Sequence, residues 1–266
     1  MGEVSNFIKV EIVKVDVKAR KFEKTEDFVA EEAPIQVFIG RKHYATIFCT
    51  PRDVKELVIG NLLSEGIVKN VGEIDKINVR ENGACHVTLK STVNTESRLK
   101  LARQLYRVIP SACGGQHQPL ALRQIKKVNS KLSVRAETVQ CCIQTLNAMS
   151  ETYRKTHGVH AAAIYNGDEA LLAFAEDAGR HNAVDKAIGK CALKGENFSQ
   201  CLLALSGRLT ADIALKAARV GIPIVASMTA ALNSGIEIAR KANLTLIGFV
   251  RGAYMKIYTA PERILP

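Results

Sequence analysis

Apolar and polar residues alternate near the N-terminus in a way that predicts extended structure. Ile8, Val10 and Ile12 are separated by polar residues, which is the pattern of a strand with one buried face. The apolar positions then move by one residue, to Val13 and the alternate residues that follow it. Because such a shift turns the apolar side chains to the opposite face of a strand, we expect a β-bulge or a short break near residues 12 and 13.

The next segment predicts a hairpin followed by a helix. Apolar runs at residues 35–39 and 45–49 flank a glycine and three polar residues, so we expect a turn of four or five residues. In the helix that follows, Thr50 is a candidate N-cap and Pro51 suits the first helical position. The helical pattern ends near Ser64, just before a glycine.

A break in the pattern separates two parts of the chain. Short strands at residues 77–79 and 86–89 and a helix near residues 97–107 precede it. Residues 110–119 are bounded by prolines and contain two adjacent glycines, so neither helix nor strand is expected there. We therefore expect a smaller α+β domain at residues 1–110, a mobile cysteine-containing loop at residues 111–119 and a larger α/β domain at residues 120–266.

The second part of the chain alternates strands and helices with short connections. After a long helix at residues 138–156, Asn166 and Gly167 join two apolar runs, which is a strong hairpin signal. The order that follows is helix 181–193, strand 201–205, helix 210–220, strand 222–227, helix 230–242, strand 244–250 and strand 255–259. Repeated strand–helix–strand units predict an α/β fold with a partly parallel sheet and helices packed on it.

Composition and charge narrow the functional classes. The 266 residues carry 37 Lys and Arg against 26 Asp and Glu, a net charge of +11, which favours anionic partners or reflects a lysine-rich solvated surface. The basic residues are spread out and no nucleic-acid-binding motif is present, so nucleic acid is not the expected partner. Because the sequence contains neither a membrane-length apolar segment nor a signal-peptide pattern, we expect a cytoplasmic protein without membrane contact.

The seven cysteines are expected to be reduced, because no secretory signal accompanies them. None forms a Cys-x-x-Cys pair, and the adjacent Cys141 and Cys142 suit core packing better than metal binding, so no metal site is expected. Cys113 lies in the predicted loop and two glycines follow it. Positive neighbours favour the thiolate form of a cysteine, and the nearby basic residues are Arg107, His117 and Arg123. An incidental free thiol is the alternative.

Two segments combine glycine and arginine where a phosphate could bind. Ser206-Gly207-Arg208 follows a strand and precedes a helix, which is where α/β sheets bind ligands. There Gly207 would let a phosphate approach the backbone, and Arg208 would supply a fixed charge. Phe249-Val250-Arg251-Gly252-Ala253-Tyr254 connects the last two strands, and an arginine beside an aromatic ring can hold a phosphate and stack on a base. In each case a plain turn is the alternative.

The charged segment from Glu176 to Asn182 raises a further question of function. Asp177, His181 and Asp185 together suggest acid–base chemistry or a metal, but His181 and Asp185 lie one helical turn apart and are more simply structural. His157 and His160 would share a face only in a helix, which Gly158 and the predicted strand after it argue against.

Several stretches in a fixed order carry a resemblance to a known family. They are Cys49-Thr50-Pro51, residues 60–66, 158–163 and 176–186, Ser206-Gly207-Arg208, and residues 221–224, 248–252 and 258–263. Together they resemble the FdhD family of formate dehydrogenase accessory sulfurtransferases. The resemblance runs from about Ile35 to Ile264, and the run from Gly179 to Lys186 is its most specific part.

The resemblance implies a function that the patterns alone do not show. Proteins of this family accept sulfur as a cysteine persulfide from a cysteine desulfurase. They deliver it to the bis(guanine dinucleotide) form of the molybdenum or tungsten cofactor, for insertion into apo formate dehydrogenase. The resemblance further implies a homodimer and a three-layer larger domain similar to cytidine deaminases, and a guanine nucleotide would mimic the cofactor.

The resemblance also assigns roles to residues of this chain. The family's loop cysteine falls on Cys113, which becomes the expected catalytic residue of a persulfide sulfurtransferase. No protein-ligated metal is expected. With the family's cofactor segment and the arginine turn combined, the expected cofactor-binding residues are Gly207, Arg208, Phe249, Val250, Arg251, Gly252, Ala253 and Tyr254.

One departure from the family keeps a second hypothesis open. The family often has Cys-x-x-Cys in this loop, whereas this chain has Gln116 at the second position. A chaperone that binds the molybdenum cofactor without transferring sulfur is therefore the alternative. A zinc deaminase, suggested by fold analogy alone, would need His-x-Glu and Pro-Cys-x-x-Cys, and the sequence has neither.

Overall fold

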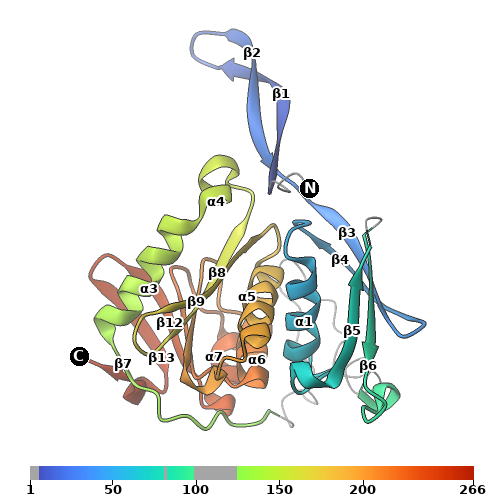
Figure 1. Ribbon diagram of the computed structural model, residues 1–266. Helices are drawn as coiled ribbons and strands as arrows, with labels where there is room; N and C mark the ends of the chain where they lie inside the picture. Colours follow the sequence, from blue (N-terminus) through green and yellow to red (C-terminus); the bar gives the residue numbers. More distant parts are fainter. Residues whose placement is uncertain (1–5, 81–82, 99–124) are drawn as a thin grey trace.

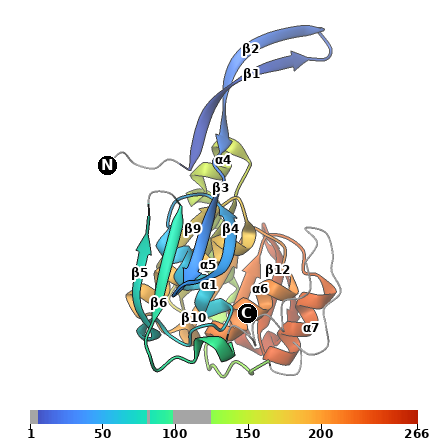
Figure 2. The ribbon, with the colours of Figure 1, turned by 90° about the vertical axis from the view of Figure 1, so that its right-hand side faces the viewer.

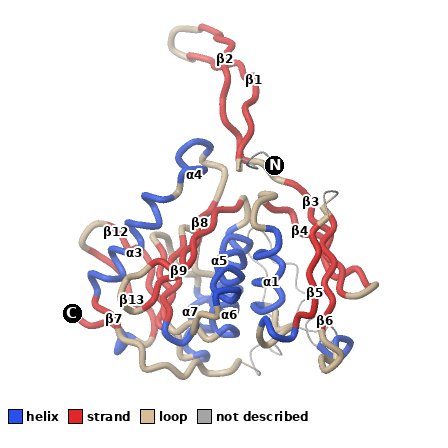
Figure 3. The backbone as a smooth tube through the Cα atoms, in the orientation of Figure 1, coloured by secondary structure: helices blue, strands red, loops and turns tan. Residues whose placement is uncertain are grey.

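The computed structural model describes residues 6–80, 83–98 and 125–266 (Figure 1). In this part of the chain a six-stranded sheet and a four-stranded sheet stand on either side of a group of helices, and a two-stranded ribbon projects away from both (Figures 1 and 3). No helix in these ranges is long and apolar enough to cross a membrane. The predicted cysteine loop and most of the helix predicted near residues 97–107 lie outside the described residues, and the predicted division into domains is not tested.

The projecting ribbon consists of β1 (Phe7–Asp16) and β2 (Lys21–Ala30), which pair antiparallel in one unbroken register (Figure 2). The bulge predicted near residues 12 and 13 is therefore wrong, and the strand β2 was not predicted. The physical reason is exposure: Val13 is 55% exposed and Phe22 is 77% exposed. Because neither face of the ribbon is buried in a core, no face requires a fixed alternation of apolar residues.

The four-stranded sheet has the order β4-β3-β6-β5. Its strands β3 and β6 are parallel, and the two outer pairs are antiparallel. The turn between β3 and β4 is only two residues long, shorter than predicted, and Gly40 in it has a φ of 60°, which glycine adopts without strain. The strands are β3 (Ala33–Ile39), β4 (Lys42–Cys49), β5 (Ile74–Val79) and β6 (Ala84–Leu89), and the one-turn helix η1 (Val71–Glu73) precedes β5.

Helix α1 (Val54–Ser64) begins later than the sequence suggests. Thr50 was expected to cap it, but the backbone N–H of Thr50 donates to Asp177 Oδ2 at 3.1 Å. Its hydroxyl oxygen accepts from the Ala178 N–H at 3.2 Å. The capping prediction is wrong because Thr50 is bound to a distant segment, and Asp53 with a φ of 55° occupies the N-cap position instead.

The six-stranded sheet has the order β13-β12-β11-β10-β8-β9 and confirms the predicted α/β class with a mixed, partly parallel sheet. Strands β10, β11 and β12 run parallel, and antiparallel partners flank them on both sides. The predicted hairpin at Asn166 and Gly167 is confirmed by the pairing of β8 with β9. The strands are β8 (His160–Asn166), β9 (Leu171–Asp177), β10 (Cys201–Leu205), β11 (Ile224–Ser227), β12 (Thr245–Arg251) and β13 (Tyr254–Thr259).

Helices cover both faces of this sheet, and each face has its own cluster of buried apolar side chains. Helix α3 packs on one face, whereas α5, α6 and α7 lie on the other (Figure 1). The single helix predicted at residues 138–156 is wrong, because the chain leaves the helical conformation at Ser150, whose ψ is 73°. The helices are α3 (Ala136–Met149), α4 (Glu151–Thr156), α5 (Arg180–Lys194), α6 (Ala211–Val220) and α7 (Asn233–Ala242).

The remaining elements are short and lie at the margins of the sheet. Strand β7 (Val134–Arg135) pairs in parallel with β14 (Ile264–Leu265) and so joins the start of α3 to the end of the chain. One-turn helices lead into β10 and β14, namely η3 (Phe198–Gln200) and η4 (Pro261–Arg263).

Helices α1 and α5 cross at two glycines and hold the two sheets together. A methyl group placed on Gly60 would come within 1.7 Å of the Asp185 carbonyl oxygen, and one placed on Gly189 would come within 1.9 Å of the Glu56 carbonyl oxygen. Only glycine allows the two backbones to approach so closely. A single apolar cluster consequently extends from the four-stranded sheet through α1 and α5 to the six-stranded sheet.

Candidate functional site

The carboxyl ends of the parallel strands β10, β11 and β12 bring three loops to one edge of the sheet. Ser227, which ends β11, donates its hydroxyl hydrogen to the Gly207 carbonyl at 2.7 Å. In the loop after β11, the Thr229 carbonyl accepts from the Phe249 N–H at 3.0 Å. The turn that holds Gly207 and Arg208 therefore lies at the carboxyl end of a strand, as predicted, and Ser227 and Thr229 connect it to the segment that begins at Phe249.

The segment from Phe249 to Tyr254 is partly buried and partly exposed. Val250 is buried, whereas Tyr254 is 83% exposed and Gly252 and Ala253 are also exposed. Arg251 is exposed as well, and its Nε donates to the Met228 carbonyl at 2.9 Å. The cofactor-binding residues expected from the sequence thus come from two loops that meet at one edge. Cys113, the expected catalytic residue, lies outside the described residues.

Strand β8 adds a histidine to the same edge, because β8 runs antiparallel to β10 and begins where β10 ends. His160 Nδ1 lies 3.3 Å from the Ser206 hydroxyl oxygen, which also accepts from the Ala161 N–H at 3.0 Å. No sequence pattern indicated a role for His160 at this edge. The predicted absence of a helical pair with His157 is confirmed, since His157 ends α4 and His160 begins β8.

Helix α5 contributes its first residue, Arg180, to this edge. A methyl group on Gly207 would approach Arg180 Cβ to 3.0 Å and Arg180 Cδ to 3.2 Å, so the Arg180 side chain lies directly against Gly207. Arg180 had no function predicted from the sequence, and its signal there was the family-specific run from Gly179 to Lys186. We call His160, Arg180 and Arg208 the Arg–His cluster.

Burial and nearby positive charges lower the pKa values of His160 and His181. Burial lowers the pKa of His160, and the positive charges of Arg180 and Arg208 lower it further. Burial, followed by the charges of Lys216 and Arg180, lowers the pKa of His181 to about 4. Both rings are therefore neutral near pH 7, and the fixed positive charge of the cluster comes from its arginines.

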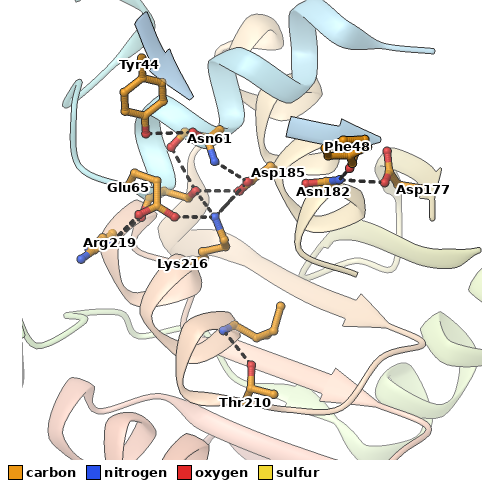
Figure 4. Close-up of polar contacts among 12 residues, drawn as sticks. Tyr44, Phe48, Asn61, Glu65, Asp177, Asn182, Asp185, Thr210, Lys216 and Arg219 are labelled. Atoms are coloured by element: carbon orange, nitrogen blue, oxygen red, sulfur yellow. Dashed lines mark hydrogen bonds and ion pairs between the residues drawn. The ribbon is translucent and has the colours of Figure 1, made fainter. Parts of the chain in front are cut away.

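Asp177 anchors the segment that carries Arg180 and His181. Its carboxylate, which is fully buried, forms an ion pair with Lys186 at 2.6 Å (Figure 4 shows Asp177 beside Asn182). The Oδ1 atom also accepts from the Gly179 N–H at 2.8 Å and from Asn182 Nδ2 at 3.0 Å. Asp177 is thus satisfied within the protein and has a structural role, so the acid–base chemistry suggested for it is not supported.

A second buried network joins α1, α5 and α6 (Figure 4). The Lys216 ammonium donates to both oxygens of Asp185 at 2.9 Å and to Glu65 Oε1 at 2.8 Å. Burial raises the pKa of the Asp185 carboxyl, and the positive charge of Lys216 opposes that rise. Burial by itself would lower the pKa of Lys216, but the negative charges of Asp185 and Glu65 outweigh it and raise the pKa of Lys216 overall. The structural interpretation of Asp185 is therefore correct.

His181, by contrast, is not explained by this network. Among the described residues, four buried side-chain atoms have no hydrogen-bond partner, and two of them are Arg180 Nε and His181 Nε2. The structural interpretation thus holds for Asp185, whereas His181 and its neighbour present unsatisfied nitrogen atoms.

The cysteines of the described ranges differ sharply in exposure. Cys142 is buried in the core as predicted, but Cys141 is exposed, so the core-packing prediction is wrong for Cys141: adjacent residues of α3 point in different directions and only one of them faces the sheet. Burial raises the pKa of the thiols of the five buried cysteines to about 11 or 12, so they are poor nucleophiles: Cys49, Cys85, Cys142, Cys191 and Cys201. The same ranges contain no group of three His, Cys, Asp or Glu side chains that could hold a metal ion.

Comparison with known proteins places the chain in a family. A protein of Bacillus subtilis named sulfur carrier protein FdhD is 36% identical over 247 residues, which cover 91% of this chain and 92% of that protein. A Sulfolobus acidocaldarius protein of the same name is 36% identical and covers 96% of this chain and 98% of its own length. A crystal structure described as a formate dehydrogenase accessory protein from Desulfotalea psychrophila superposes with a TM-score of 0.78 at 25% identity, covering 98% of this chain and all of that one. Because residues 30–265 also match the FdhD/NarQ family model, this chain belongs to the FdhD/NarQ family.

Proposed function

We propose that this chain is a sulfur carrier for the maturation of formate dehydrogenase. In this proposal Cys113 accepts persulfide sulfur from a cysteine desulfurase. It then passes the sulfur to the bis(guanine dinucleotide) form of the molybdenum or tungsten cofactor, which is the cargo and not a resident group. Support comes from relatives named sulfur carrier protein FdhD that cover most of the chain. The structural observation that carries the proposal is the meeting of the Arg208 and Arg251 loops at one edge of the sheet.

The loading step is a thiol–persulfide exchange. The Cys113 thiolate attacks the terminal sulfur of the donor persulfide, so one S–S bond forms while another breaks, and the donor cysteine leaves as a thiolate. The five buried cysteines are unsuited to this step, because burial keeps them in the thiol form. Cys141, the exposed cysteine of the described ranges, is the natural control.

The cargo has the chemistry that this edge of the sheet suits. Two pyrophosphate groups and two guanine bases require fixed positive charge and a flat surface for stacking. In the proposal Arg208 and Arg251 supply the charge, Gly207 and Gly252 allow the backbone to come close, and the exposed Tyr254 ring stacks on a base.

The proposal is tested by intact mass spectrometry after incubation with a cysteine desulfurase and cysteine. We expect the wild-type chain and the Cys141→Ala variant to gain the mass of one sulfur atom, and the Cys113→Ala variant to gain none. We also expect Cys113→Ala to fail to activate formate dehydrogenase. If Cys113→Ala loads sulfur and activates the enzyme as well as wild type, the carrier role of Cys113 is wrong.

A second candidate is a chaperone that binds the cofactor without transferring sulfur, and Gln116 favours it. Without a second loop cysteine, Cys113 has no local partner with which to form a loop disulfide. The two candidates differ in one result. A chaperone binds guanine nucleotide but acquires no sulfur on Cys113, whereas a carrier shows both.

A further inference from the structure

The ribbon of β1 and β2 is anchored at its base and has no apolar core of its own. Asn6 Nδ2 donates to Thr152 Oγ1 of α4 at 3.1 Å, and the Lys155 ammonium lies 4.5 Å from the centre of the Phe7 ring. Phe7 also packs edge-on against Phe28 of β2, with the ring centres 5.2 Å apart. The ten-residue strands span about 33 Å, so the far end of the ribbon lies clear of the body (Figure 2).

Apolar and charged side chains are separated at this far end, residues 13–24, which we call the ribbon end. The pairing register places Val13 and Val15 of β1 on the same face as Phe22 of β2. The opposite face carries two cross-strand pairs of opposite charge, namely Lys14 with Glu23 and Asp16 with Lys21. The shift of the apolar pattern at residues 12 and 13 therefore gives the ribbon end one apolar face and one charged face.

The ribbon end also carries positive charge that no acidic side chain offsets. Lys18 and Arg20 lie in the turn between the strands, beside Val17, which is 82% exposed. Lys24 lies on the apolar face, which Phe22 leaves open to solvent. None of these three cations forms an ion pair with another residue that the structure describes. The ribbon end thus combines exposed apolar groups with unpaired cations.

This combination suits the surface of an anionic lipid bilayer. Apolar side chains gain free energy by entering the boundary between headgroups and acyl chains, and each Lys or Arg near an anionic surface adds attraction. A second copy of the chain is the competing occupant, but its ribbon end carries the same positive charge, so two ribbon ends would repel each other. The family match begins at residue 30 and therefore leaves nearly all of the ribbon out.

We propose that the ribbon end binds the surface of an anionic lipid bilayer, with Val17 and Phe22 among the headgroups and Lys18, Arg20 and Lys24 against the lipid phosphates. The contact is peripheral and needs no membrane-spanning helix. The expectation of no membrane contact came from the lack of a spanning segment, which does not bear on such a contact. The proposal goes beyond the proposed function, because it concerns where the chain acts and not what it transfers.

Co-sedimentation of the full chain with lipid vesicles tests the proposal. We expect wild type to sediment with vesicles of phosphatidylglycerol and phosphatidylcholine in equal amounts, but not with vesicles of phosphatidylcholine alone. Phe22→Ser should lower the partition coefficient at least about fivefold, because it removes an apolar ring, and Lys18→Glu should do the same, because it reverses a charge. The matched controls are Phe48→Ser on β4 and Lys76→Glu on β5, which change exposed residues away from the ribbon and should bind as wild type does.

A second readout uses the absence of tryptophan from the chain. In Phe22→Trp the introduced indole is the sole tryptophan, so its fluorescence reports on the ribbon end alone. With the anionic vesicles we expect its emission to shift to shorter wavelength and its quenching by acrylamide to fall, because the indole leaves water. Phe48→Trp should show neither change.

Four results would overturn the proposal. They are no sedimentation of wild type with the anionic vesicles, equal sedimentation of wild type with both kinds of vesicle, equal partition of wild type and Phe22→Ser, and unchanged emission of Phe22→Trp. Self-association that Phe22→Ser abolishes in sedimentation velocity, without vesicle binding by wild type, would assign the ribbon end to a second copy and also overturn it. None of these results bears on sulfur loading of Cys113, which is measured without lipid.

Discussion

Removal of the Lys216 ammonium group should destabilise the protein far more than the loss of an exposed lysine. In Lys216→Met the side chain keeps a similar length but loses its donors to Ser64, Glu65 and Asp185. The Asp185 side chain is only 1% exposed, so water cannot replace the lost cation. An uncompensated buried charge costs about 3–5 kcal/mol.

The contacts that remain in the network determine how much the free energy of unfolding falls in Lys216→Met. Asp185 keeps hydrogen bonds from Ser64 Oγ at 2.7 Å and Asn61 Nδ2 at 3.0 Å, and Arg219 stays 3.4 Å from Glu65. These contacts solvate the carboxylates only partly, so we expect a loss near 3 kcal/mol in the free energy of unfolding. For a chain of this size that loss lowers the midpoint of thermal unfolding by about 6–12 °C.

The assay is urea unfolding followed by circular dichroism at pH 7, with Lys42→Met as control. Lys42 pairs with Glu96 on the surface, where the side chains are 64% and 80% exposed, so its loss should change stability by less than about 1 kcal/mol. In Lys216→Met, the lone Asp185 should have a pKa above its unfolded value. The folded state then binds more protons, so the deficit of the variant should shrink as the pH falls from 8 to 5.

Two outcomes would contradict this reasoning. One is a Lys216→Met stability within about 1 kcal/mol of wild type. The other is a deficit that stays constant between pH 8 and pH 5. Either would mean that the Lys216 ammonium does not compensate the buried carboxylates.

Three further predictions follow from the packing and from the pKa shifts. Gly189→Ala would place a methyl group 1.9 Å from the Glu56 carbonyl oxygen, so we expect the free energy of unfolding to fall by several kcal/mol. A free energy of urea unfolding within about 1 kcal/mol of the wild-type value would refute the close crossing. The pKa of His181, about 4, lies below its unfolded value, so the free energy of unfolding should fall as the pH drops from about 6.5 to 4. His181→Gln should remove up to about 3 kcal/mol of this pH-dependent loss, measured by urea unfolding at several pH values. A pH profile identical to that of wild type would contradict the lowered pKa. Alkylation of the native protein with iodoacetamide, read by peptide mass spectrometry, should modify Cys141 and spare the buried cysteines, which are Cys49, Cys85, Cys142, Cys191 and Cys201. Labelling of a buried cysteine as fast as that of Cys141 would be inconsistent with the fold.

Much of the α/β part of the fold follows from local signals in the sequence. Strand β10, helix α6 and strand β11 have clear apolar runs, and Thr210 caps α6 with its side chain while Gly221 ends it in a left-handed conformation. These elements are buried, so a single apolar pattern satisfies both local preference and packing. The ribbon formed by β1 and β2 could not be predicted in the same way, because its polar and apolar residues are exposed on both faces.

The residues of the candidate site also differ in whether the sequence alone could place them. Gly207 and Arg208 could be placed from the sequence, because a turn after a parallel strand always lies at the carboxyl edge of the sheet. His160 and Arg180 could not, because their positions depend on the antiparallel pairing of β8 with β10 and on the packing of α5. For the same reason Thr50 was assigned to a helix cap, when its partners lie in the segment just before α5.

The glycine crossing of α1 and α5 limits how far the two sheets can move apart. Separating the two sheets would pull the Gly60 and Gly189 backbones apart and break the hydrogen bonds that Asp177 and Asp185 accept from α1 and the segment before it, although both carboxylates would keep their lysines. It would also divide the apolar cluster that extends through both helices, and exposing that apolar surface to water is unfavourable. We therefore expect the two sheets to move as one rigid body.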